Sequence, residues 1–201
     1  MLAHEQQAQK DGFDLVIGID EAGRAPLAGP VVAAAVCVRD HHFSRRIDDS
    51  KKLTAKQRQD AFDEIVEHCD FGVGLISEQQ IDTHNILQAT FMAMNAAVLD
   101  LAMSLKLDPS KVCLLVDGNR FTTHLPYAYR TIIGGDAQSL SIACASILAK
   151  VTRDRLLVAY DKIFPQYGFA KHKGYPTKDH KKAIALHGLS PIHRRTFRHA
   201  L

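Results

Sequence analysis

The chain has 201 residues, of which 46% are hydrophobic and 23% charged, with a formal net charge of +3. This composition is typical of a globular protein, and we expect a single domain over residues 1–201 that acts as a monomer. No apolar run reaches the roughly 18 residues that a membrane span needs. Residues 1–12 are polar and contain no signal-peptide core, so we expect a flexible tail there, a cytoplasmic protein and no membrane partner.

In chain order, the hydrophobic pattern predicts strands over 13–20 and 29–38, a helix over 55–69 behind the cap Thr54, a strand over 71–76, and a helix over 77–105 interrupted near 82–85. It continues with strands over 112–116 and 129–133, a helix over 139–164, a loop over 168–176, and a helix over 177–187. This order indicates the α/β class, with the last strands joined by helical crossovers.

The cysteines are scattered through mainly apolar segments, without a Cys-x-x-Cys pair that would indicate zinc. We expect reduced thiols in the core at Cys37, Cys69, Cys113 and Cys144.

Charge is unevenly distributed along the chain. Residues 171–201 contain eight lysines and arginines against one acid, so this segment carries +7 while residues 1–170 carry −4. The same segment contains Tyr175, Phe197 and five histidines. A solvated surface is one interpretation, but this mixture of cations and rings favours contact with nucleic acid.

Four acids lie at expected strand ends or at a helix start. Asp20 and Glu21 end the first strand before the turn at Gly23, Asp117 ends a later strand, and Asp136 precedes a helix. Adjacent strand residues point to opposite faces, so we expect a turn after the first pair to bring both carboxylates to one point. Each acid alone would be a cap or a turn former. Together they predict a site for a hard cation such as Mg²⁺ or Mn²⁺, which prefers oxygen ligands.

Five motifs cover most of the chain: GIDEAGRAPLAGPVVAAAV at 18–36, DDSKKLT at 48–54, LLVDGN at 114–119, GGDAQSLSIACASILAKVTRDR at 134–155 and FPQYGFAKHKGYPTKDH at 164–180. As a set they closely resemble bacterial ribonuclease HII. The resemblance implies a ribonuclease H-like mixed five-stranded sheet flanked by helices. We therefore expect a core over 13–165 and a basic C-terminal helical extension over 166–201.

The resemblance also implies an activity. The expected enzyme is a metal-dependent endoribonuclease that hydrolyses the RNA strand of RNA–DNA hybrids. It would also cut on the 5′ side of ribonucleotides embedded in duplex DNA, leaving a 5′-phosphate and a 3′-hydroxyl. By motif, Asp20, Glu21, Asp117 and Asp136 match the catalytic carboxylates that hold two divalent ions, Mg²⁺ or Mn²⁺, during catalysis.

The expected substrate contacts fall into three groups. Gly23, Arg24 and Ala25 match a loop that recognises the 2′-hydroxyl by which a protein distinguishes RNA from DNA. Tyr175 matches a tyrosine that packs on the deoxyribose after the ribonucleotide. Candidates for phosphate contacts, each of which alone is explained equally well as a solvated charge, are Lys51, Lys52, Lys173, Arg194 and Arg195.

Ala25 departs from the family pattern Gly-Arg-Gly. If that glycine adopts a left-handed backbone, alanine costs roughly 1 to 2 kcal/mol of strain. Even with a compatible backbone, the methyl group would press on a ribose that glycine admits closely, so we expect slower cleavage than in an Ala25→Gly variant. A negative φ at Ala25, with the methyl group away from substrate, would remove that effect. Two other functions fit less well. A non-catalytic hybrid-binding module has no use for clustered carboxylates, and a DNA nuclease of the same fold has no use for a 2′-hydroxyl sensor.

Overall fold

The computed structural model describes residues 1–198 and contains one five-stranded mixed sheet in the order β3-β2-β1-β4-β5. The strands are β1 (Leu15–Ala22), β2 (Val31–Val38), β3 (Cys69–Ile76), β4 (Val112–Asp117) and β5 (Ala128–Ile132). The first three pair antiparallel, whereas β4 pairs parallel with both β1 and β5. The expected mixed five-stranded sheet is confirmed.

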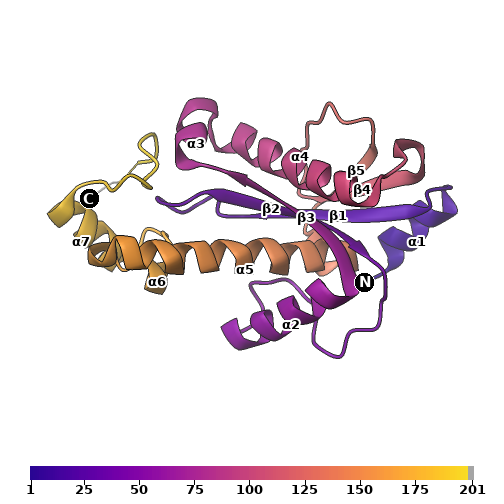
Figure 1. Ribbon diagram of the computed structural model, residues 1–201, viewed down its shortest axis with the longest axis horizontal. Coiled ribbons are helices and arrows are strands. Elements are labelled where there is room, and N and C mark those ends of the chain that lie inside the picture. Colours follow the sequence, from indigo (N-terminus) through magenta and orange to yellow (C-terminus); the bar gives the residue numbers. More distant parts are fainter. Residues whose placement is uncertain (199–201) are drawn as a thin grey trace.

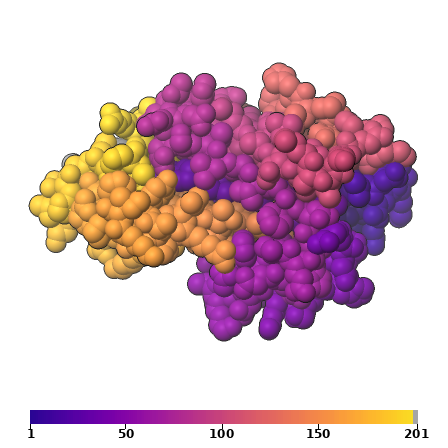
Figure 2. All heavy atoms as spheres, in the orientation of Figure 1, coloured from indigo at the N-terminus to yellow at the C-terminus, as the bar shows by residue number. Residues whose placement is uncertain are grey.

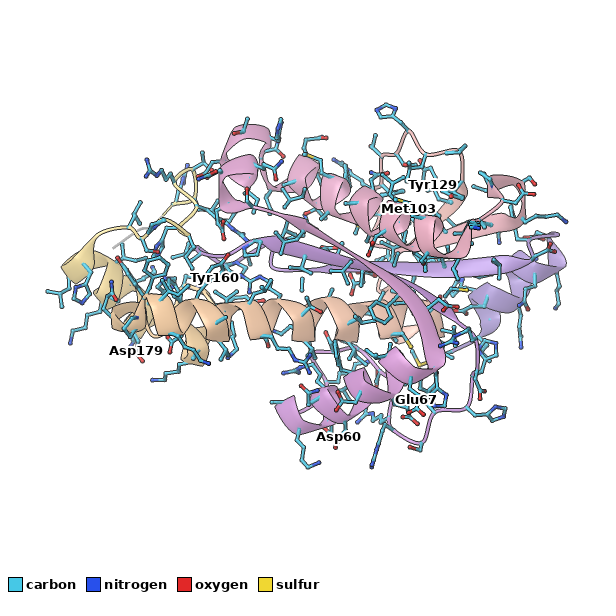
Figure 3. The ribbon with its side chains drawn as sticks, viewed as in Figure 1. Asp60, Glu67, Met103, Tyr129, Tyr160 and Asp179 are labelled. Atoms are coloured by element: carbon cyan, nitrogen blue, oxygen red, sulfur yellow. The ribbon has the colours of Figure 1, made fainter. Side chains whose placement is uncertain are left out.

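Helices cover both faces of the sheet (Figure 1). One face is covered by α3 (Glu78–His84) and α4 (Ile86–Leu105), and the other by α2 (Ala55–His68) and α5 (Leu140–Ile163). Successive side chains of β2 point to opposite faces of the sheet and so into two separate parts of the core. Ala33 and Ala35 pack with α4, while Ala34 and Val36 pack with α2 and α5. Asp60 and Glu67 mark the outer side of α2 (Figure 3).

The helix boundaries follow capping chemistry. Thr54 forms a capping box with Gln57 at the start of α2, as its position in the sequence predicts. Asn85, with φ of 66°, separates α3 from α4, and its side chain accepts hydrogen bonds from the amides of Leu87 and Gln88. The expected interruption near residues 82–85 is therefore confirmed.

The expectation that no apolar segment is long enough to span a membrane was wrong. The helix α4 is long and apolar enough to cross a membrane by length and composition alone. Its buried residues, including Phe91, Met94 and Leu101, pack on the sheet. The need to fill the core explains the apolar character of this helix.

The structure also corrects two predicted connections. The parallel strands β4 and β5 are joined by residues 118–127, which contain no helix, so only the connection from β3 to β4 is a helical crossover. Within the expected loop over 168–176, residues Phe169–His172 form the short helix α6. Phe169 is fully buried and stacks on Tyr167, and this local apolar contact orders the turn.

The expected flexible tail over residues 1–12 is instead largely a helix, α1 (Ala3–Lys10). The carboxylate of Glu5 is buried and accepts hydrogen bonds from the Ser139 hydroxyl (2.6 Å) and from the Ser141 amide and hydroxyl (3.0 and 2.9 Å). A negative charge at the N-terminus of a helix is favourable, so Glu5 stabilises the start of α5.

The C-terminal extension forms one end of the molecule (Figure 2). It contains α6 and α7 (Lys178–His187), and Asp179 on α7 lies at the opposite end from Met103 and Tyr129 (Figure 3). Its apolar cluster joins Ala28 of the β1–β2 connection to Leu157 of α5 and to Phe169. The extension is thereby packed against the loop that follows β1. The division between core and extension at residue 165 stays a prediction.

Candidate active site

Strand register brings three of the predicted carboxylates together. Ile19 of β1 lies opposite Val116 of the parallel strand β4, so Asp20 and Asp117 follow side by side at the same end of the sheet. Glu21 is the next residue of β1. These predicted acids thus come from two adjacent strands inside the sheet.

The structure corrects the expected turn after the acidic pair. β1 continues to Ala22, so Asp20 and Glu21 both lie within the strand and point to opposite faces. Opposite Asp20 is Ala34, which packs toward α5, and opposite Glu21 is Ala33, which packs toward α4. The two carboxylates reach a common space by lying at the end of the sheet rather than by a bend in the backbone.

That space is a cavity of about 220 Å³. It brings together three of the predicted acids, the loop expected to recognise the 2′-hydroxyl, and Tyr175, which come from distant parts of the sequence. Its lining residues are Asp20, Glu21, Ala22, Gly23, Arg24, Ala25, Ser50, Lys51, Asp117, Ser146, Lys150 and Tyr175. Sequence reasoning missed Ser50, Ser146 and Lys150 as members of the site, although all three lie in the motifs.

Asp136 lies beside this cavity and is held by Lys51. The ammonium of Lys51 is 3.3 Å from the Asp136 carboxylate and 3.9 Å from that of Asp49. Asp136 is 5% exposed and acts on Asp117 through its charge. Among residues 1–198, no three His, Cys, Asp or Glu side chains are arranged closely enough to hold a metal ion. The carboxylates therefore lie in or beside one cavity without forming a ready coordination cage, and the ammonium of Lys51 occupies part of their surroundings.

The electrostatics of the cluster show a deficit of positive charge. Burial raises the pKa of Asp20 well above its ordinary value, and the charges of Glu21 and Asp117 raise it further. Burial likewise raises the pKa of Glu21, which Arg24 at 3.4 Å partly offsets. The pKa of Asp117 is raised by burial, although the Gly135 amide donates to its carboxylate (2.7 Å). Oxygen donors that repel one another in a cavity fit a divalent cation, which would relieve the repulsion.

A second cavity, of about 300 Å³, adjoins the first through Glu21, Arg24 and Asp117. Its other walls are α4 and the segment after β4, including Asn119 and Arg120. Asn119 belongs to the LLVDGN motif, and that motif could have predicted its position beside the acids. Arg120 is exposed and lies outside the motifs, so no feature of the sequence indicated its position in this cavity.

The loop after β1 tests the backbone conformation expected at Ala25. Gly23 has φ of 102°, whereas the residues other than glycine with positive φ in the described chain are Asn85, Lys106 and Lys173. Ala25 is therefore outside the left-handed region, and its side chain is exposed. The expected backbone strain at Ala25 was wrong, because the turn places its left-handed residue at Gly23.

Tyr175 lines the same cavity as Asp20, Glu21 and Asp117. The residue is 38% exposed, and the ammonium of Lys150 lies 5.7 Å from the ring centroid. A partly exposed aromatic ring beside a cation gives a surface suited to a sugar and its phosphate.

Buried histidines fix the backbone of Tyr175. The amide of Ser190 donates to Nδ1 of His193 (2.9 Å), which places the proton of His193 on Nε2. That proton is donated to Nε2 of His180 (3.0 Å), and Nδ1 of His180 donates to the Tyr175 carbonyl (2.9 Å). Both imidazoles are neutral in this chain of bonds. The two rings therefore act as spacers between the C-terminal segment and the loop that carries Tyr175.

The predicted phosphate contacts differ in exposure. Arg195 and Lys52 are exposed, as a phosphate contact requires, and Lys52 pairs with Asp48 at 3.3 Å. Lys173 turns back and donates to the carbonyl of Ala170. Arg194 is 0% exposed, so its assignment as a phosphate contact was wrong. Charge in a basic segment does not reveal which cations the fold buries.

Comparisons with known proteins identify the family. A family model described as Ribonuclease HII matches residues 17–200. The ribonuclease HII of Ruminiclostridium cellulolyticum is 50% identical over 202 residues, covering 98% of this chain and 75% of that protein. The solved ribonuclease H2 from Pyrococcus horikoshii OT3 matches with a TM-score of 0.70 at 25% identity, covering 92% of this chain and 95% of that one.

A solved structure of Bst-RNase HIII in complex with Mn²⁺ matches with a TM-score of 0.74, covering 96% of this chain and 70% of that one. At 17% identity, this match bears on the fold alone. The family model and the relative at 50% identity show a metal-dependent ribonuclease H. The chain belongs to the ribonuclease HII family.

Proposed function

We propose that the protein hydrolyses the RNA strand of RNA–DNA hybrids and cuts duplex DNA on the 5′ side of embedded ribonucleotides. The observation that carries this proposal is the single cavity shared by Asp20, Glu21 and Asp117, the loop at Gly23 and Tyr175. Hydrolysis requires the acids, and recognition of a ribonucleotide requires a group that senses the 2′-hydroxyl. One cavity holds candidates for both tasks.

The acidic residues support hydrolysis at a phosphodiester. Asp20, Glu21, Asp117 and Asp136 would hold two divalent cations, Mg²⁺ or Mn²⁺, and Bst-RNase HIII was solved with Mn²⁺. Bound cations would activate water, neutralise the scissile phosphate and stabilise the departing 3′ oxygen. Lys51 would release Asp136 and be free to contact the phosphate chain. The products would be a 5′-phosphate and a 3′-hydroxyl.

The loop and the tyrosine support selection of the substrate. The exposed side chains of Arg24 and Ala25 border the cavity, so a ribose placed against the acids would contact this loop. The ring of Tyr175 would pack on the next sugar, where a 2′-hydroxyl would interfere with close contact. Arg195, Lys51 and Lys52 would bind phosphates without reading sequence.

Two further expectations remain proposals. Action as a monomer is the first of them. All four cysteines are free and buried, which confirms the expected core thiols and supports a reducing compartment such as the cytoplasm.

The deciding experiment uses labelled duplexes of one sequence: a uniform RNA–DNA hybrid, a DNA duplex with one ribonucleotide, and all-DNA. Each is incubated with Mg²⁺, with Mn²⁺ and with chelator, and the product ends are mapped. We expect cleavage of the first two substrates only with metal, on the 5′ side of the ribonucleotide. Binding without cleavage would indicate a binding module, and cleavage of the all-DNA duplex would indicate a DNA nuclease.

A further inference from the structure

Two arginines are buried beneath the loop that follows β1. Arg153 of α5 is 1% exposed, and Arg194 of the C-terminal segment is 0% exposed. Burial of a guanidinium is costly unless its donors are satisfied. The partners of these two side chains therefore indicate what their burial achieves.

Arg194 donates hydrogen bonds to three backbone carbonyls of this loop. Nη2 reaches the carbonyl of Gly23 (2.5 Å), Nη1 that of Arg24 (2.9 Å), and Nε that of Gly29 (2.9 Å). One planar side chain thus holds both ends of the loop, including two residues of the segment expected to read the ribose. The rigid fork of arginine makes this possible, whereas the point charge of lysine does not.

Arg153 continues the same network on its other side. It donates to the carbonyls of Pro30 (3.0 Å) and Ala28 (2.8 Å), and also to that of Lys173 (2.9 Å), two residues before Tyr175. A Cβ atom at Gly23 would lie 2.1 Å from Nε of Arg153, so the guanidinium packs directly against that glycine. Arg153 therefore links the loop to the segment that carries the tyrosine.

Backbone contacts complete the link between the two segments. The amide of Leu27 donates to the carbonyl of Gly174 (2.8 Å), and the amide of Arg194 donates to the carbonyl of Leu27 (2.9 Å). Gly174 has φ of 82°, and a Cβ atom there would lie 2.5 Å from the carbonyl oxygen of Ala28. The loop and the tyrosine segment are in contact without space between them.

The pair has a counter-charge nearby. Burial lowers the pKa of Arg153 to about 10, and burial together with the charge of Arg153 lowers that of Arg194 to about 9. Glu78 opposes both effects through its own charge. It is 8% exposed, and its Oε1 has no hydrogen-bond partner among the described residues. At neutral pH both guanidiniums stay charged and keep all their donors.

We propose that Arg153 and Arg194 are positioning residues that hold the loop at residues 23–30 and the segment at 173–175 as one reading unit. The inference rests on the proposed function, since the unit matters only if these segments contact the substrate. The spacing between the loop at Gly23 and the ring of Tyr175 is fixed by this pair. That spacing decides the preference for a ribonucleotide followed by a deoxyribonucleotide over a uniform hybrid.

The test compares Arg194→Lys and Arg153→Lys with a matched control, Arg155→Lys. Arg155 lies on the same helix as Arg153, but its guanidinium packs over the ring of Phe62. Single-turnover rates are measured on the duplex with one ribonucleotide and on the uniform hybrid. We expect the ratio of the two rates to fall by about tenfold in the first two variants, since a misplacement near 1 Å costs up to about a hundredfold. The ratio should be unchanged in the control.

Hydrogen exchange supplies a second measurement that needs no substrate. The amides of Leu27 and Gly29 should exchange faster in both variants, while those of β1 and β4 keep their protection. Equal losses of rate on both substrates, or unchanged exchange in the loop, would overturn the inference. Failure of both variants to fold would also overturn it, because the arginines would then act on the whole fold. If the unmodified protein cleaves neither substrate, the proposed function itself fails.

Discussion

The acidic cavity and the guanidinium pair both bury charge, but they differ in how that charge is satisfied. Asp20, Glu21 and Asp117 repel one another, and burial and repulsion raise the pKa of Asp20. Arg153 and Arg194 instead direct their donors at backbone carbonyls. The difference indicates separate roles, because unrelieved repulsion suits a site that takes up a cation, whereas satisfied donors suit a rigid support.

The largest expected effect lies in the acidic cavity. Asp117→Asn keeps the volume of the side chain but removes an anionic ligand that lines both cavities. Loss of an outer partner of a metal ligand alone costs about 10- to 100-fold in affinity or activity. We therefore expect the single-turnover rate to fall by more than about a hundredfold, with duplex binding retained. A rate near normal, in a variant whose melting temperature is unchanged, would remove Asp117 from the catalytic set.

A smaller effect is expected at Tyr175, on the part of the cavity expected to recognise the sugars of the substrate. Tyr175→Ala removes the partly exposed ring but leaves the backbone bond to His180 in place. We expect an about tenfold loss on the single-ribonucleotide duplex, since stacking contacts are worth roughly 1 to 3 kcal/mol. The loss on a uniform hybrid should be clearly smaller. Tyr175→Phe is the matched control, and equal losses on both substrates would make the ring a general contact.

The repulsion among the buried acids also predicts that neutralising one of them makes the folded protein more stable. Because the folded-state pKa of Asp20 is raised above 3.8, its contribution to stability is present below the unfolded-state pKa and is lost as pH rises through the folded-state pKa. At neutral pH, Asp20→Asn should therefore raise the melting temperature of the metal-free protein by a few degrees, as 1 kcal/mol corresponds to roughly 2–4 °C.

This gain should shrink as the pH is lowered, because the carboxyl group then becomes protonated in the original protein as well. The control is Asp63→Asn on the exposed surface of α2, where we expect no comparable gain. A lower melting temperature for Asp20→Asn at neutral pH would contradict the repulsion in the cavity.

The smallest effect is expected at Ala25. Its backbone lies outside the left-handed region and its methyl group is exposed, so a glycine relieves no strain. We expect Ala25→Gly to change the single-turnover rate by less than about twofold, well below the cost of a 1 Å misplacement. A tenfold gain on the single-ribonucleotide duplex would show that the methyl group presses on the substrate.

The sequence predicted an α/β fold and a cluster of acids because both depend on local pattern, whereas the mixed five-stranded sheet was implied by the resemblance. Asp117 ends an apolar strand and Asp20 lies near the end of another, and strand ends in this class lie together. Arg153 and Glu5 were missed because their partners are distant in sequence, at Ala28 and Ser139. A single arginine in a helix and a single glutamate near a terminus look like solvated charges. Only the packing of remote segments shows that these side chains are buried.

The contact between α1 and α5 has a consequence for the order of events during synthesis. Glu5 precedes its partner Ser139 by 134 residues. At roughly 5–20 residues per second, translation leaves the glutamate without this partner for roughly 7 to 27 seconds. During that time the Glu5 carboxylate must stay hydrated. Although α1 is made before the sheet, Glu5 can therefore close the start of α5 only after most of the sheet has been made.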